Sequence, residues 1–151
     1  MEKLRADLKK NHAFISVMSL DKPIKYTVTK HPRLKKYVNE LDFAYRVFLY
    51  CCVLGCSYNV SLNGPGDVID EVWHAHILHS EQYQFQCNKI FGSYLHHSPV
   101  DGDAEKKEES SALLDLMKFL IKKDHKWLEQ AIPIIKLFMN VDLIKCSCAK
   151  N

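Results

Sequence analysis

The sequence predicts a mostly α-helical protein: a small orthogonal helical bundle of about five helices with a short extended N-terminal segment. Apolar residues recur at helical spacing along several stretches, and only five Gly and five Pro interrupt the 151 residues. The hydrophobic fraction of 47% and the charged fraction of 26% exclude wholesale disorder. We expect an N-terminal helix or arm over 1–19, one helical domain over 20–145 and a Cys-containing tail over 146–151.

The first thirty residues predict two different conformations. Residues 1–15 favour a short helix with a basic face, formed by lysines and an arginine. By contrast, Ile24, Tyr26 and Val28 alternate with polar neighbours, which is the period of a strand. We therefore expect an extended segment over Ile24–Val28.

The next stretch predicts the central helix of the core. It follows Pro32 and runs to about Gly55, with Leu41, Phe48 and Cys52 on one face. Its second half is apolar almost all round, which is typical of a helix buried on every side. Residues 57–66 contain Asn-Gly-Pro-Gly and predict a loop with tight turns.

A second helix is predicted from Asp67 to Phe91. Asp67 is the candidate N-cap, and Gly92 follows the last apolar residue in the position of a left-handed C-terminal residue. Ser80 is a possible N-cap inside this stretch. The helix is thus either continuous or divided into two near Ser80.

The remaining chain predicts a linker and further helices. Residues 101–111 are polar and predict an exposed linker, followed by a helix over 111–123. A last apolar segment over 127–144 contains Pro133, which starts a new helix or kinks one.

Composition excludes several classes of protein. The net charge of +3 is too small to indicate nucleic-acid binding, and no run approaches the roughly 18 apolar residues of a membrane span.

The N-terminus is polar and shows no secretory signal, so we expect a cytoplasmic protein, with export by a non-classical route as the alternative. Without such a signal the six Cys are expected to be reduced, and no CxxC pair predicts a self-contained zinc finger. An unknown protein partner is compatible with this small single domain, whose oligomeric state the sequence leaves open.

One feature rises above this background: a cluster of metal-ligand side chains. Five of the eight histidines and one cysteine fall within residues 74–97. Because each helical residue turns by 100°, Asp70 and His74 share one face, whereas His76 lies on the opposite face with Cys87. An unbroken helix separates His76 from Cys87 by roughly 16 Å along its axis, so those two could not share an ion.

A helix break near Ser80 would change this geometry. Asp70, His74 and His76 could then fold toward Cys87, His96 and His97. A mixed nitrogen, sulfur and oxygen site for zinc, with iron as the alternative, would be open. Asp70 is the best candidate for a carboxylate that orients an imidazole, because it lies beside His74.

The motifs resemble a known family. Tyr45-Arg46-x-Phe48-Leu49, then residues 68–78 (VIDEVWHAHIL), then Tyr83, Cys87, Phe91-Gly92 and Leu95-His96-His97-x-Pro99 are similar, over roughly residues 20–102, to the glycine-rich domain-containing-protein-like family. The family has threonine where Ser80 stands and an acidic residue where Gln86 stands. The glycine-rich part of that family is missing here.

The resemblance implies a signature within residues 41–99 rather than a reaction. Its members are Asp70, Trp73, His74, His76, Tyr83, Cys87, His96 and His97. We expect His74, His76, Cys87, His96 and His97 as metal ligands, with Asp70, Trp73 and Tyr83 orienting them. The expected function is a small helical metal-binding domain, which could be a metal-dependent enzyme with an open position for water. The alternative is a structural or protein-interaction module whose histidines form a buried hydrogen-bond network.

Overall fold

A computed structural model describes residues 1–62, 64–97 and 103–145, with the backbone alone over 103–111. These parts contain eight α-helices, three short 3-10 helices and no strand. In chain order the elements are α1 (Glu2–Asn11), α2 (Ala13–Val17), α3 (Asp21–Lys30), η1 (Pro32–Tyr37), α4 (Val38–Ser57), α5 (Asp67–Leu78), α6 (Ser80–Phe91), α7 (Asp103–Lys122), η2 (Lys126–Ala131), α8 (Ile132–Leu137) and η3 (Val141–Ile144). The prediction of a mostly helical chain is confirmed. The count of about five helices and the orthogonal arrangement are not confirmed.

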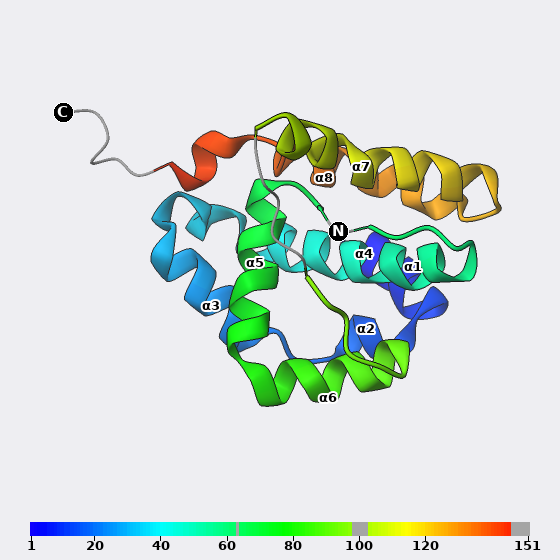
Figure 1. Ribbon diagram of the computed structural model, residues 1–151, viewed down its shortest axis with the longest axis horizontal. Helices are drawn as coiled ribbons and strands as arrows, with labels where there is room; N and C mark the ends of the chain where they lie inside the picture. Colours follow the sequence, from blue (N-terminus) through cyan, green and yellow to red (C-terminus); the bar gives the residue numbers. More distant parts are fainter. Residues whose placement is uncertain (63, 98–102, 146–151) are drawn as a thin grey trace.

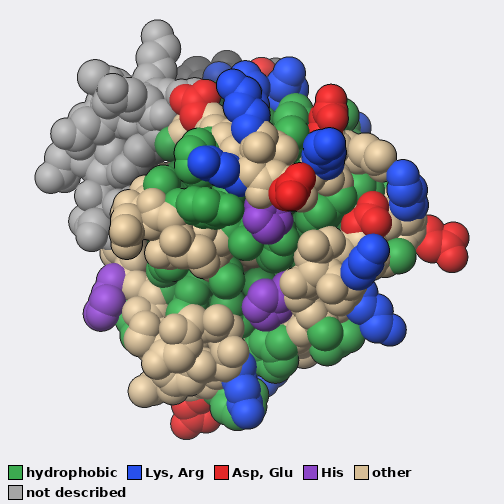
Figure 2. All heavy atoms as spheres, turned by 90° about the vertical axis from the view of Figure 1, so that its right-hand side faces the viewer, with side chains coloured by type: hydrophobic (Ala, Val, Ile, Leu, Met, Phe, Trp, Pro, Cys, Tyr) green, Lys and Arg blue, Asp and Glu red, His purple; other side chains and the backbone are tan. Residues whose placement is uncertain are grey.

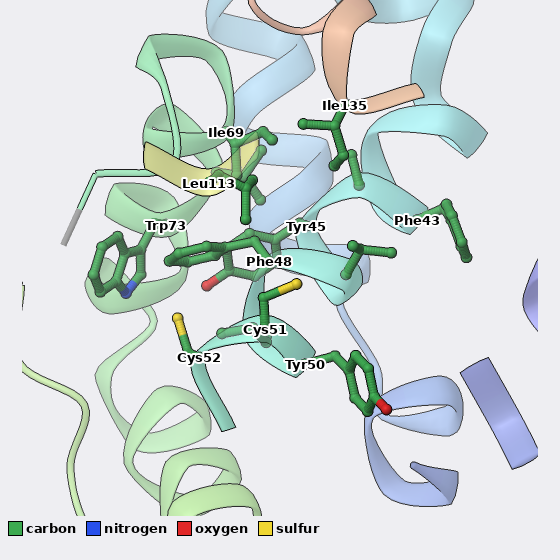
Figure 3. Packing of buried hydrophobic residues seen from close by; sticks show 14 of the residues in the cluster. Phe43, Tyr45, Phe48, Tyr50, Cys51, Cys52, Ile69, Trp73, Leu113 and Ile135 are labelled. Atoms are coloured by element: carbon green, nitrogen blue, oxygen red, sulfur yellow. The ribbon is translucent and has the colours of Figure 1, made fainter. Parts of the chain in front are cut away.

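Helix α4 is the central helix, as its sequence predicted. Every residue from Phe43 to Cys52 is buried. Figure 1 shows α4 in the middle of the molecule, between α7 and α6, with α5 running across it. Its aromatic side chains pack into the core, where the Phe48 and Trp73 ring centroids lie 4.9 Å apart (Figure 3).

The predicted N-terminal helix is two helices that pack into this core. The chain leaves helical geometry at His12, whose Nδ1 accepts a hydrogen bond from the Ile15 backbone N–H at 3.2 Å and so caps α2. Leu8 and Ile15 are fully buried in the same hydrophobic cluster as α4. The region expected as an arm thus shares the core of the main domain.

The extended segment over Ile24–Val28 is wrong: these residues belong to α3. Ile24, Thr27 and Val28 are buried at helical spacing, and Tyr26 is 46% exposed. Asp21 in the first turn and Lys30 in the last turn both suit the helix dipole. The alternation of Ile24, Tyr26 and Val28 was a coincidence of composition, and packing against α4 and α5 selects the helix.

The linker over 101–111 is also wrong where the structure describes it, because α7 begins at Asp103. Lys and Glu are good helix formers, and the polar stretch extends the apolar helix that follows it. Pro133 lies in the first turn of α8, so of the two predicted alternatives it starts a helix and does not kink one. The Cys tail over 146–151 lies outside the described residues.

The surface shows no large patch of one charge on the face drawn in Figure 2. Lysine and arginine side chains alternate there with acidic ones around apolar side chains. No helix in the described part of the chain is both long enough and apolar enough to cross a membrane.

Candidate metal centre

The stretch predicted as one helix divides at a single residue. Helix α5 ends at Leu78, α6 begins at Ser80, and His79 between them has φ −86° and ψ 65°. Ser80 makes no side-chain cap, so the break lies one residue earlier than its capping signal suggested. After the break, α6 runs crosswise from the lower end of α5 (Figure 1), and Tyr83 on α6 accepts a hydrogen bond from Trp73 on α5.

The chain reverses again after α6. Gly92 adopts the left-handed conformation with φ 72°, as predicted for the residue after this helix. The following residues return toward α5, where the Tyr83 hydroxyl donates a hydrogen bond to the Leu95 carbonyl at 2.5 Å. This return places His97 beside the helix that carries His74.

Three side chains converge there: Asp70, His74 and His97. The Nε2 atoms of the two histidines are 2.8 Å apart. Asp70 Oδ2 lies 3.2 Å from His74 Nε2, and Asp70 Oδ1 lies 2.9 Å from His97 Nε2. Two nitrogens and a carboxylate thus point at one small volume, with their ligand atoms all within 4.8 Å of one another.

The Asp70 carboxylate lies on the ligand side of the histidines and not behind one of them, as its sequence position had suggested. An orienting carboxylate binds the imidazole nitrogen that faces away from the metal. Here both carboxylate oxygens approach the Nε2 atoms, the nitrogens of each ring that face the common volume. Asp70 therefore fits the ligand set itself, together with His74 and His97.

The His97 ring packs against an aromatic side chain of α5. Its ring stacks on the indole of Trp73, with centroids 4.0 Å apart and an interplanar angle of 20°. Burial lowers the pKa of His97 below its ordinary value, and the neighbouring His74 lowers that pKa further. This shift favours the neutral imidazole, the state in which it can bind a metal. By contrast, the His74 side chain is 50% exposed, so the cluster opens to solvent on its side.

His76 lies apart from this cluster, in the core. Its Nδ1 accepts a hydrogen bond from the Tyr45 hydroxyl at 2.7 Å, and its Nε2 lies 2.5 Å from Gln86 Oε1. Gln86 Nε2 donates to the Ser19 carbonyl at 2.8 Å, which identifies Oε1 as the acceptor from His76. Both ring nitrogens are thus used within a buried network, and neither is directed at Asp70, His74 and His97.

Cys87 and His96 also lie outside the converging group. The Cys87 thiol is buried within hydrogen-bonding reach of the Leu95 backbone and the Tyr83 hydroxyl, and burial raises its pKa. A thiol in that state is a poor metal ligand, because ligation requires the thiolate. His96 is exposed, and its ring lies 4.8 Å from that of Tyr94. Of the five predicted ligands, the structure therefore brings together His74 and His97.

The fold and the cluster define a class of protein: a small helical domain with two histidines and one aspartate at a junction between helix and returning chain. A profile of the UCP032817-like family matches residues 10–134, and the chain belongs to this family. The matched family does not link the chain to glycine-rich proteins, so the resemblance to the glycine-rich domain-containing-protein-like family stays a prediction. A search of curated proteins and a search of solved structures gave no match.

Proposed function

We propose that this protein binds one divalent transition-metal ion through Asp70, His74 and His97. The observation that carries this proposal is the convergence of two imidazole nitrogens and a carboxylate from sequence positions 70, 74 and 97. Zinc bonds of about 2.0–2.2 Å in a tetrahedron separate two ligand atoms by about 3.3 Å. The observed separations are 2.8 Å between the two imidazole nitrogens and 2.9 and 3.2 Å from these nitrogens to the two different oxygens of Asp70, all within about half an ångström of that value.

Zinc is the first choice of metal and iron(II) the second. Two histidines and one carboxylate form a common ligand set of zinc hydrolases, and the same set binds iron in oxygenases. The buried thiols lie outside this set, which argues against soft ions that require sulfur.

Three ligands converge among the described residues, and this number indicates a site with an open position. Structural zinc sites use four protein ligands, whereas three protein ligands leave room for water. The half-exposed His74 gives solvent access to this position. A metal held this way activates water near neutral pH, so we propose metal-assisted hydrolysis as the reaction class if the protein is an enzyme.

Metal analysis of purified protein tests the binding proposal. After chelator treatment, titration with Zn²⁺ and anaerobic titration with Fe²⁺ should each be followed to saturation, with one ion per chain expected. His74→Ala and His97→Ala should each weaken binding by more than the roughly 10–100-fold that follows loss of an outer contact. His96→Ala is the matched control, because it removes an adjacent imidazole outside the cluster and should bind as wild type does. Absence of stoichiometric binding by the wild type, or equal affinity in all variants, would overturn the proposal.

The second candidate function is a structural or protein-interaction module. The network of Tyr45, His76 and Gln86 favours it, since buried and satisfied polar groups specify a unique core without any metal. Melting temperature separates the two candidates. A chelator should lower the melting temperature by several degrees if a metal stabilises the folded state, and should leave it unchanged if the histidines act through hydrogen bonds alone.

A further inference from the structure

The Tyr83 hydroxyl lies where the returning chain meets α5. Tyr83 is fully buried, and its hydroxyl accepts a hydrogen bond from Trp73 Nε1 at 2.9 Å while donating to the Leu95 carbonyl. One oxygen atom thus joins three parts of the chain: α5, α6 and the segment before His97.

One partner of this hydroxyl contacts the His97 ring, and the other lies close to His97 along the chain. Trp73 provides the ring on which His97 stacks at 4.0 Å, and Leu95 precedes His97 by two residues. We propose that Tyr83 is the positioning residue of the metal site: it fixes both the platform beneath His97 and the backbone that carries it. This inference rests on the metal-binding function proposed above.

The metal site needs this positioning because two of its ligands lie on one helix and the third does not. Asp70 and His74 are one turn apart on α5, so the helix itself sets their spacing. His97 follows a helix end and a glycine turn, and belongs to no helix. Its imidazole therefore depends on tertiary contacts to stay within bonding distance of the other two ligands.

Tyr83→Phe isolates the hydroxyl. The phenyl ring keeps the edge contacts that Tyr83 makes with His76 and Tyr94, at centroid distances of 4.8 and 5.1 Å. The substitution removes the bonds to Trp73 and Leu95 and leaves the buried Trp73 N–H and the part-buried Leu95 carbonyl without this partner, so some stability is lost as well.

Tyr45→Phe provides the matched control for that loss of stability. Tyr45 is also fully buried, and its hydroxyl also makes a hydrogen bond to a buried group, His76 Nδ1 at 2.7 Å. Both variants should therefore melt at a lower temperature than the wild type. The two variants differ in the bonds that are lost. The Tyr83 hydroxyl bonds to Trp73 and Leu95, which hold His97, whereas the Tyr45 hydroxyl bonds to His76.

Metal titration of the three proteins gives the first test. Tyr83→Phe should weaken Zn²⁺ binding about 10–100-fold, the usual cost of losing an outer contact that orients a ligand. Tyr45→Phe should bind within about twofold of the wild type, as independent sites do. Equal affinities in Tyr83→Phe and the wild type, or equal losses in both variants, would overturn the positioning role while leaving the metal site in place.

A second measurement needs no metal and separates this inference from the proposed function. Because the His97 ring stacks on Trp73, we expect the NMR signals of its ring protons upfield of those of an exposed histidine in the metal-free protein. Tyr83→Phe should return these signals toward the values of an exposed histidine, whereas Tyr45→Phe should leave them in place. Unchanged His97 signals in Tyr83→Phe would refute positioning even if the metal binds. Failure of the wild type to bind Zn²⁺, with the His97 signals moved as expected, would refute the metal function and leave Tyr83 as the residue that holds His97.

Discussion

At the scale of single residues, His76 and His97 differ in what their ring nitrogens contact. Both nitrogens of His76 have neutral hydrogen-bond partners, Tyr45 and Gln86, and burial lowers its pKa to about 4. His97 Nε2 instead faces Asp70 and His74. Surroundings rather than residue type therefore decide which histidine is suited to a metal.

The buried His76 predicts a loss of stability in mild acid. Its folded pKa of about 4 lies below the ordinary value of 6.5, so the unfolded chain binds the proton more readily between these values. The free energy of unfolding should therefore fall as the pH drops from 6.5 to 4, by roughly 3 kcal/mol for this group. Urea denaturation at a series of pH values measures the fall.

His76→Gln is the control for this pH dependence. Glutamine keeps hydrogen-bonding capacity but has no proton to gain, so the part of the acid sensitivity due to His76 should disappear. The difference between the two curves isolates His76 from His12 and His97, whose pKa values burial also lowers. Two parallel curves would contradict the assignment.

At the scale of elements, two short backbone features direct the chain to the site. His79 separates α5 from α6, and its Nδ1 lies 2.8 Å from the Ala75 carbonyl at the end of α5. Gly92 then ends α6 with φ 72°. These two backbone features determine which segments of the chain lie next to each other, whatever the ligand side chains are.

Gly92→Ala should destabilise the protein by about 1 kcal/mol. An alanine Cβ at this position meets nothing within 4 Å, so the cost comes from the left-handed conformation alone. Gly92→Asn should cost less, since asparagine tolerates this conformation better. Chemical denaturation of both variants provides the measurement, and an alanine variant as stable as the wild type would show that the turn can relax.

At the scale of the whole molecule, a buried arginine joins the N-terminal helices to the core. Arg46 on α4 is 7% exposed and donates to the Ile15 carbonyl at 2.6 Å. It also makes two bonds to Asp42, at 2.9 and 3.1 Å. The polar residue that interrupts the apolar stretch of α4 thus connects distant parts of the chain.

Arg46→Leu should lower the free energy of unfolding by roughly 3–5 kcal/mol, because it leaves the buried Ile15 carbonyl without this donor and removes the nearer cationic partner of Asp42. Arg5→Leu is the matched control. Arg5 approaches the same Asp42 at 3.4 Å but is 41% exposed, so its loss should cost less than about 1 kcal/mol. Urea unfolding of the two variants tests the contrast, and similar costs would refute it.

Local signals were sufficient for much of the fold. Gly92 marked a helix end, and the apolar run before Cys52 marked the central helix. Pro133 predicted either a helix start or a kink, and the structure has the start. They failed at α3, where a five-residue alternation also suits a strand and only the packing of Ile24 and Val28 selects the helix.

The sequence by itself determined the mostly helical content and the pairing of Asp70 with His74, because residues four apart on a helix are neighbours whatever surrounds them. Only the tertiary structure decided that His97 joins this pair and that His76, Cys87 and His96 do not. The physical reason is that the break at His79 allows many orientations of α6 and of the chain that follows it relative to α5. Burial of Trp73 and Tyr83 against the returning chain selects one of them.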